Sequence, residues 1–437
     1  MAKHGKHFVS SDHQFAYKKL MSTTQCTWVA KEVISYYKRK GSQVYACLLD
    51  CSKAFDKIHF DILFQKLLDK GISPIIVRLL LHSYIHSTVQ VKWNNSTSDS
   101  FNISNGVRQV LSPLLINIYI DDLVKDLKHD GRGCWVGSEY YGILIYADDI
   151  LLIAPTVSAL SAMVKSCENF GYNTGLEFNS KKTICIQFHS QGACNSQINT
   201  PTICLNKTSL KWCKSVKHLG HTISCCALFD EDIVVKKCQF IACVNDIITE
   251  FSFAHPRVKC KLLQIYGTSF YGSCLWNLYS SSAKSLCTTW NIALRKLNGL
   301  PYRTHTKYLD YISGIKHLSF ILKRRFLCFI QKLIMSENTL MRNIVNIVLS
   351  DMSSPTSVVL SRIISEYDLG TMSSFRTQFE NSCRLYDSNY INVHGLSQEE
   401  SSYCHTINEI INCIHGSLDV TLNREQCHIL LEQLATM

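Results

Sequence analysis

Two adjacent carboxylates, Asp148 and Asp149, are the residues whose types and spacing best suit them for chemistry. Apolar runs lie on both sides of the pair, at 143–145 and 150–153, a pattern typical of a β-hairpin with the acids at its bend. Because paired strands hold a bend rigidly, two carboxylates placed there can share a divalent metal ion. The pattern therefore indicates metal-assisted chemistry on phosphates, although a bare Asp-Asp pair is more often a solvated turn.

A second acidic pair, Asp121 and Asp122, serves as a comparison. The apolar residues around it, from Leu114 to Leu123, recur at helical spacing. We therefore expect these two acids on a helix, exposed to solvent. Only the pair at 148–149 has strand-like runs on both sides.

A third carboxylate comes from residues 44–50, which read as a buried strand that ends at Asp50. The sequence continues Cys-Ser-Lys-Ala-Phe-Asp, and together with the Tyr-Ala-Asp-Asp hairpin it resembles the palm of reverse transcriptases. The resemblance is closest to enzymes of non-LTR (LINE-like) retrotransposons. It implies that Asp50, Asp148 and Asp149 bind two Mg²⁺ ions, for which Mn²⁺ can substitute, and that these carboxylates are catalytic.

Further segments resemble the same family in the same order along the chain. Residues 105–123 resemble the loop and helix beneath the template and the incoming nucleotide, and residues 14–23 resemble the last fingers motif. The roles that the resemblance implies are nucleotide binding by Arg108 and Gln109, a steric gate against ribonucleotides at Phe55, protonation of the leaving pyrophosphate by Lys182, and a primer grip at His218, Leu219 and Gly220.

The sequence departs from this family at two places. Family members carry a glycine and one further residue between the positions of Gln109 and Val110, so the nucleotide-binding loop is shortened here. In the fingers motif, Ala16 and Leu20 stand where the family has glycines. The chain also starts almost inside that motif, and no endonuclease domain is recognisable. These features predict truncated fingers and doubtful catalytic competence.

Composition agrees with a protein that handles nucleic acid inside the cell. The chain has 437 residues and a net charge of +11, which favours polyanionic partners. Its 21 cysteines include no Cys-x-x-Cys pair, and the C-terminal Cys and His residues from Cys404 to His428 match no standard zinc spacing. With no signal peptide and no long apolar run, we expect an intracellular protein, nuclear or cytoplasmic, with reduced, buried thiols and no membrane contact.

The predicted fold class is α+β, a right-hand polymerase palm with truncated fingers followed by a mostly helical thumb and C-terminal region. The predicted domains are a fingers remnant at 1–43, a palm at 44–225, a thumb-like region at 226–335 and a helical region of unknown role at 336–437. Periodicity predicts helices at 26–39, 60–70, 75–85, 158–170, 232–251 and 257–278, and strands at 88–93 and 183–188. Trp276, Trp290 and Tyr302 could stack on bases but are more often core residues.

The function that the resemblance implies is RNA-directed DNA polymerisation, with an RNA template, a DNA primer and dNTP as partners. Three alternatives stay open. A catalytically dead nucleic-acid-binding protein would bind without extending a primer. A structural protein built on an old polymerase palm would bind nucleic acid weakly and with little salt dependence. A group II intron maturase shares the fold, but the sequence of residues 48–56 resembles LINE-like elements, and no maturase region is recognisable.

Overall fold

The structure is a computed structural model that describes residues 10–52, 54–102, 105–107, 111–190, 201–226 and 229–372, with scattered residues from there to 408. The chain divides into two compact units. The first comprises Met1–Leu219, Ser224–Cys226 and Ser336–Val348, and the second comprises Gly220–Ile223, Ala227–Met335 and Leu349–Met437.

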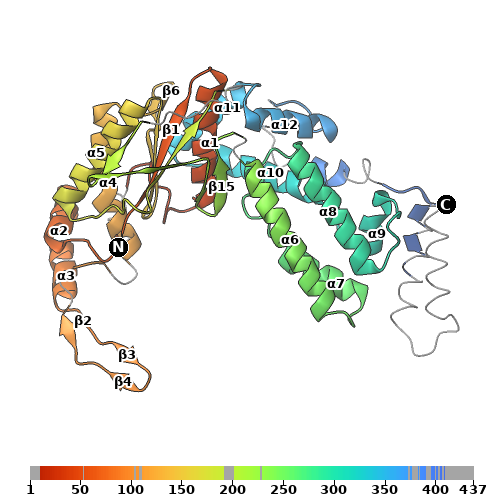
Figure 1. The fold of residues 1–437 in the computed structure, drawn as a ribbon, viewed down its shortest axis with the longest axis horizontal. Helices are drawn as coiled ribbons and strands as arrows, with labels where there is room; N and C mark the ends of the chain where they lie inside the picture. Colours follow the sequence, from red (N-terminus) through yellow and green to blue (C-terminus); the bar gives the residue numbers. More distant parts are fainter. Residues whose placement is uncertain are drawn as a thin grey trace. The chain divides into compact units, whose positions relative to one another are not determined.

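A five-stranded sheet forms the centre of the first unit (Figure 1). Its strands, in sheet order, are β13 (Lys211–Cys213), β10 (Ile184–Phe188), β1 (Val44–Asp50), β9 (Asp149–Ala154) and β8 (Ile143–Tyr146). All neighbours are antiparallel except the parallel pair β10 and β13. The predicted α+β class, the strand at 44–50 and the hairpin around 148–149 are confirmed.

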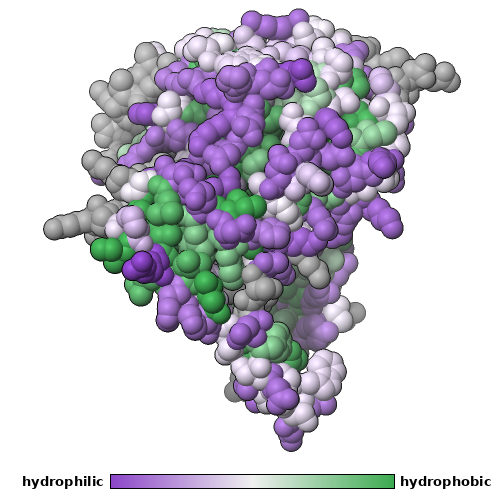
Figure 2. All heavy atoms as spheres, turned by 90° about the vertical axis from the view of Figure 1, so that its left-hand side faces the viewer, coloured by the Kyte–Doolittle hydropathy of each residue, from purple (hydrophilic) through white to green (hydrophobic). Residues whose placement is uncertain are grey.

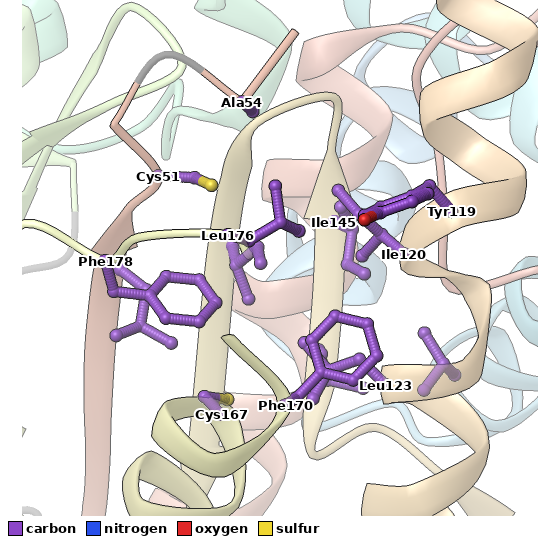
Figure 3. Close-up of a cluster of buried hydrophobic side chains, with 14 of the residues drawn as sticks. Cys51, Ala54, Tyr119, Ile120, Leu123, Ile145, Cys167, Phe170, Leu176 and Phe178 are labelled. Atoms are coloured by element: carbon purple, nitrogen blue, oxygen red, sulfur yellow. The ribbon is translucent and has the colours of Figure 1, made fainter. Parts of the chain in front are cut away.

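Four helices share one buried apolar core with this sheet. They are α2 (Phe60–Asp69), α3 (Pro74–Ile85), α4 (Ser112–Asp130) and α5 (Val157–Thr174). Figure 3 shows the core beneath the hairpin, where Ile145, Leu123 and Phe170 come together from a strand and two helices. Burying several large apolar side chains in one cluster contributes on the order of 2 kcal/mol for each. The strands of the hairpin are therefore anchored by a well-packed apolar core.

Helix α1 (Thr23–Arg39) follows the fingers-like motif and starts at Ser22, whose hydroxyl accepts a hydrogen bond from the Gln25 backbone N–H at 3.3 Å. Just before it, Leu20 has a φ of 62° and its side chain is 78% exposed. This is one of the two positions where family members carry glycine. A bulky residue in the left-handed region is strained because its Cβ crowds the backbone.

We expect Leu20→Gly to raise the free energy of unfolding by about 1 kcal/mol, because glycine takes this φ without strain and the exposed leucine loses little packing. Thermal or urea unfolding measures the change. Leu20→Ala is the matched control, since it removes the same side chain and keeps the Cβ. Equal stability of the two variants would show that backbone strain is not the cause.

A narrow arm extends beyond α3 (Figure 1). It consists of β2 (Thr88–Val89) paired with β5 (Phe101–Asn102), and β3 (Lys92–Trp93) paired with β4 (Ser96–Thr97). The predicted continuous strand at 88–93 is therefore wrong, because the ladder is interrupted where the Val91 N–H bonds the Ser98 hydroxyl. Figure 2 shows apolar surface gathered above this arm. Ile75 and Leu79 of α3 and Trp93 of β3 are exposed apolar residues.

Short strands complete the first part of the chain. They are β6 (Trp135–Val136), β7 (Glu139–Tyr140), β11 (Cys204–Leu205), β12 (Thr208–Ser209), β14 (Ser215–His218) and β15 (His221–Ser224). Helix α11 (Thr339–Ser350), from late in the sequence, begins in the first unit. Its N-terminus is held there by Asp12, whose carboxylate accepts a hydrogen bond from the Thr339 N–H at 2.9 Å.

The second unit is helical. Its main helices are α6 (Asp230–Glu250), α7 (Pro256–Leu262), α8 (Ser281–Asn298), α9 (Leu309–Ser313), α10 (Leu318–Ile334) and α12 (Pro355–Glu366). Shorter turns are η2 (Leu263–Gly267), η3 (Ser273–Leu275) and η4 (Thr306–Tyr308). Helix α6 matches the predicted helix at 232–251 closely.

The predicted helix at 257–278 is wrong beyond Gly267. The chain leaves the helix there and turns through Gly272 at a φ of 81°. The turn carries Trp276 into the core, where its indole N–H donates to Asp232 at 2.8 Å. Trp276 and Trp290 are fully buried, as predicted, but Tyr302 is 79% exposed and does not belong to the core.

Among the described residues, no single helix combines the length and apolar character that a membrane span requires. Only α11 and α12 taken together meet the length and composition criteria, and they are separated by a bend. Both helices bury apolar side chains within the protein.

Candidate active site

The hairpin and strand β1 bring two carboxylates face to face. Asp50, at the end of β1, lies directly opposite Asp149, at the start of β9, and Tyr146 lies opposite Asp149 on the other side. Ala147 and Asp148 form the two-residue turn between β8 and β9. Ala147 has a φ of 59°, as the first central residue of a type II′ hairpin turn requires. Residues about a hundred positions apart therefore place three carboxylates at one end of the sheet.

The carboxylates of Asp50, Asp148 and Asp149 are close enough for their charges to affect one another. Burial raises the pKa of Asp149 above its usual value, and the charges of Asp148 and Asp50 raise it further. The same two carboxylates add to the effect of burial on Cys51, whose pKa is raised to about 12. Like charges held this close favour a bound cation, because it relieves their repulsion.

A turn at Asn179 brings Lys182 to this cluster. The Asn179 side-chain oxygen accepts from the backbone N–H groups of Lys181 at 3.0 Å and Lys182 at 3.3 Å. The Asn179 N–H donates to the backbone oxygen of Asp50 at 2.9 Å, which ties this turn to β1. Lys182 Nζ lies 4.0 Å from Asp50 Oδ2, and its side chain is 70% exposed. An exposed ammonium group therefore lies beside the Asp50 carboxylate.

The segment after β1 supports the start of the loop that is predicted to bind the nucleotide. The Val107 N–H donates to the Phe55 backbone oxygen at 2.7 Å, and the Gly106 N–H donates to the Ile58 oxygen at 2.9 Å. Gly106 has a φ of 89°, and a Cβ there would lie 2.9 Å from the Asp56 backbone, so only glycine fits. The Phe55 ring is partly buried against the core.

Two residues expected at the nucleotide, Arg108 and Gln109, lie outside the described residues. The structure therefore describes the root of this loop and leaves their predicted roles as predictions. Most of the C-terminal Cys and His residues between Cys404 and His428 also lie outside the described residues, because residues 409–437 are not described.

Of the predicted primer-grip residues, His218 ends β14, and Leu219 and Gly220 form a left-handed turn before β15. Leu219 has a φ of 49° and Gly220 a φ of 81°. In the second unit, the His221 ring stacks on Tyr271, with ring centroids 4.9 Å apart and planes at 5°. His221 is fully buried, and neither ring nitrogen has a hydrogen-bond partner among the described residues. Burial lowers its pKa to about 4.

This histidine predicts a pH dependence of stability. Its pKa is about 4 when folded and 6.5 when unfolded, so between these values the unfolded chain binds more protons. Stability is therefore lost as pH falls through this window, by on the order of 3 kcal/mol. We expect His221→Phe, which keeps the stack on Tyr271, to reduce this loss. Urea unfolding at pH 7 and pH 4.5, followed by tryptophan fluorescence, measures it, and identical losses in both proteins would contradict the prediction.

The part of the sequence that contains the candidate site matches a known protein family. Residues 3–223 match the family model described as reverse transcriptase (RNA-dependent DNA polymerase). The chain belongs to the reverse transcriptase family. The match covers β1, the hairpin and the Lys182 turn, and it reaches the turn at Leu219 and Gly220.

Curated relatives show that this reverse transcriptase domain is of the non-LTR retrotransposon type. The chain is 27% identical over 180 residues to the retrovirus-related Pol polyprotein from the type-1 retrotransposable element R2 of Nasonia vitripennis. It is 28% identical over 161 residues to that from the type-2 element R2DM of Drosophila melanogaster. The alignments cover 41% and 36% of this chain but only 18% and 15% of those polyproteins.

Solved structures also show similarity. The structure of apo telomerase from Candida tropicalis matches over 98% of this chain and 58% of its own, with 15% identity and a TM-score of 0.38. Telomerase from Candida albicans, in complex with a TWJ fragment of telomeric RNA, matches over 78% of this chain and 54% of its own, with 12% identity and a TM-score of 0.37.

The donor atoms of the candidate site suit Mg²⁺, which prefers carboxylate oxygens. Asp50 and Asp149 occupy paired strand positions, and Asp148 precedes Asp149 on the turn. Within the part of the chain that the structure describes, no three His, Cys, Asp or Glu side chains are already grouped as a metal site. The carboxylates therefore fit the ion by type and by backbone position, and their side chains are not gathered into a ligand set.

The expectation of a solvated second acidic pair is wrong for Asp121. On α4 of this reverse transcriptase, Asp121 is only 6% exposed and pairs with Lys70 at 2.8 Å, while its other oxygen accepts from the Ser11 N–H. Asp122 is more exposed and pairs with Lys66 and Lys125. Both acids are structural ion-pair partners. The sequence pattern located the helix but not the lysines that approach it.

Proposed function

We propose that the chain is an RNA-directed DNA polymerase domain that transfers a nucleotide from dNTP to a primer 3′-hydroxyl. The observation that carries the proposal is the placement of Asp50 opposite Asp149, with Asp148 on the adjoining turn. Rigid strands hold these carboxylates at one end of the sheet. In-line phosphoryl transfer needs such a fixed cluster of negative charge.

Each of the predicted site residues would have a separate role in nucleotide transfer. Asp50, Asp148 and Asp149 would hold two Mg²⁺ ions, which when bound stabilise the attacking and leaving oxygens of the displacement. Lys182 is a flexible cation 4.0 Å from Asp50, within reach of a leaving pyrophosphate that it would protonate. Phe55 would exclude the ribose 2′-hydroxyl, while Arg108 and Gln109 would contact the nucleotide. His218, Leu219 and Gly220 would hold the primer end.

A primer-extension assay on poly(rA)/oligo(dT), first with Mg²⁺ and then with Mn²⁺, tests the proposal. We expect incorporation of dTTP that depends on the divalent ion. Extension that persists after chelation of divalent ions would contradict the metal-dependent mechanism.

A second candidate function, nucleic-acid binding without catalysis, is favoured by the shortened loop after Gln109. A displacement of about 1 Å at the nucleotide can cost on the order of a hundredfold in rate. In that case the chain binds template-primer with a steep salt dependence and does not extend it under either metal. Binding curves at several salt concentrations, run beside the extension assay, separate the two functions.

A further inference from the structure

The N-terminal segment before α1 lies along the hairpin of the candidate site. Gln14 forms a parallel bridge with Ile145 of β8. The Phe15 N–H donates to the Ile145 oxygen at 2.8 Å, and the Ile145 N–H donates to the His13 oxygen at 2.8 Å. Backbone hydrogen bonds therefore fix this segment against the strand that leads to Ala147.

The Gln14 side chain reaches the turn itself. Its Oε1 accepts from the Ala147 N–H at 3.2 Å and from the Ala16 N–H at 3.0 Å. Gln14 is only 2% exposed, so these bonds form away from water. Ala147 is a non-glycine residue at a φ of 59° and immediately precedes Asp148. A backbone conformation of this kind costs free energy and persists only where its surroundings hold it.

A second buried amide holds Ala16, two residues after Gln14. Asn117 of α4 is buried, and its Nδ2 donates to the Ala16 backbone oxygen at 3.0 Å. Gln14 Nε2 and Asn117 Oδ1 have no hydrogen-bond partners in the described part of the chain. The bonds that are made fix the orientation of both amides, because only an oxygen can accept from Ala147 and only an N–H₂ group can donate to Ala16.

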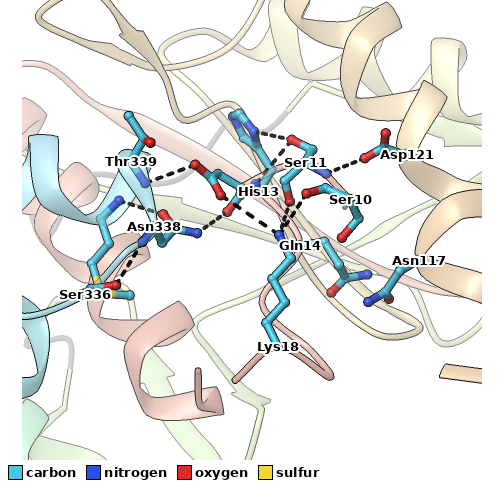
Figure 4. A network of polar contacts seen from close by, with 12 residues as sticks. Ser10, Ser11, His13, Gln14, Lys18, Asn117, Asp121, Ser336, Asn338 and Thr339 are labelled. Carbon is cyan, nitrogen blue, oxygen red and sulfur yellow. Dashed lines mark hydrogen bonds and ion pairs between the residues drawn. The ribbon is translucent and has the colours of Figure 1, made fainter. Parts of the chain in front are cut away.

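The wider network gives the segment further support (Figure 4). His13 Nε2 contacts the Tyr140 backbone oxygen at 2.9 Å, and Asn338 Nδ2 donates to the Asp12 backbone oxygen at 2.8 Å. The Ser11 N–H donates to Asp121. Residues from three distant parts of the chain thus hold Gln14 in place, and all of them belong to the first unit.

We propose that Gln14 is a positioning residue for the carboxylate turn. By accepting the Ala147 N–H, it holds the left-handed turn residue and thereby directs Asp148 and Asp149 toward Asp50. The inference rests on the proposed function for its consequence, metal binding at these carboxylates. The contact itself can be tested without that function.

The test combines amide hydrogen exchange at Ala147 with Mn²⁺ affinity in the full chain. Gln14→Met keeps the side-chain volume and removes the acceptor, so exchange at Ala147 should accelerate about tenfold or more and Mn²⁺ affinity should fall about tenfold. Gln14→Glu retains an acceptor oxygen, and we expect it to preserve protection of Ala147. Unchanged exchange within α5, which belongs to the same unit as Gln14, shows that each variant is folded.

A second-site variant tests the route of the effect. Glycine takes a positive φ without support, so adding Ala147→Gly to Gln14→Met should restore Mn²⁺ affinity to within about threefold of the natural chain. A double variant as weak as Gln14→Met would overturn the claim that Gln14 acts through the Ala147 backbone. So would normal Ala147 protection, or normal Mn²⁺ affinity, in Gln14→Met.

Asp148→Asn separates failure of this inference from failure of the proposed function. It should leave Ala147 protected while it weakens Mn²⁺ binding. If Asp148→Asn binds Mn²⁺ as tightly as the natural chain, the proposed metal site is wrong, and exchange at Ala147 alone then decides the role of Gln14.

Discussion

Asp148→Asn is expected to reduce single-nucleotide incorporation by at least about a thousandfold, the largest effect of any substitution considered for this chain. Asparagine keeps the shape of the side chain and removes its charge. The carboxylates of the candidate site interact through their charges. Burial raises the pKa of Asp149, and the charges of Asp148 and Asp50 raise it further. With only two carboxylates left, the site is a poorer partner for two divalent ions. Single-turnover incorporation of dTTP at saturating template-primer measures the loss.

Asp126→Asn is the matched control, because Asp126 is an exposed residue of α4 in the same unit. The same chemical change there should leave incorporation within about twofold of the natural chain, as surface substitutions usually have small effects. Undiminished extension by Asp148→Asn would show that the acidic pair is an ordinary turn. Equal losses in both variants would point to a general effect of charge.

Phe55→Val is expected to admit ribonucleotides and to lower the preference for dNTP over NTP by on the order of a hundredfold. The Phe55 ring is only partly buried, so part of it is free to contact a ligand. Its backbone oxygen accepts a hydrogen bond from the Val107 N–H, which places Phe55 at the root of the predicted nucleotide-binding loop. Removing the ring opens the volume that a 2′-hydroxyl would occupy. The ratio of kcat/KM for dTTP and UTP on the same primer measures the change.

Phe60→Val provides the control for this substitution. Phe60 is another partly buried ring of the same core, and it packs against Phe64 and Tyr84. Both variants should lose stability, but only Phe55→Val should change the sugar preference. Unchanged selectivity in Phe55→Val would assign the ring to the core alone.

Local patterns in the sequence were sufficient to predict the elements that carry the candidate site. The strand at 44–50, the helices near 60–70 and 75–85, and the hairpin around Asp148 and Asp149 all follow from the spacing of apolar residues over short stretches, although the turn itself is formed by Ala147 and Asp148, and Asp149 begins β9. Such spacing reports which side of an element is buried, and that depends mainly on neighbours in the chain. Resemblance to a known family then gave the carboxylates their proposed roles.

Local patterns failed where a residue's surroundings come from elsewhere in the chain. Asp121 has the spacing of an exposed helical residue, yet Lys70 and the N-terminal segment bury it. Tyr302 has the type of a core residue but lies in an exposed loop, and the helix predicted at 257–278 ends early where the chain turns at Gly272 to bring Trp276 into the core. Tertiary packing outweighs local preference in each case.

The sequence by itself determined the family, the hairpin and the three acidic residues of the candidate site. Only the tertiary structure decided that Asp50 lies opposite Asp149 and that Gln14 holds the turn between Tyr146 and Asp148. The physical reason is separation along the chain. The packing of the whole sheet sets the register between β1 and β9 and the hydrogen bond that spans 133 residues. The spacing of residues within a short stretch of sequence does not specify that packing.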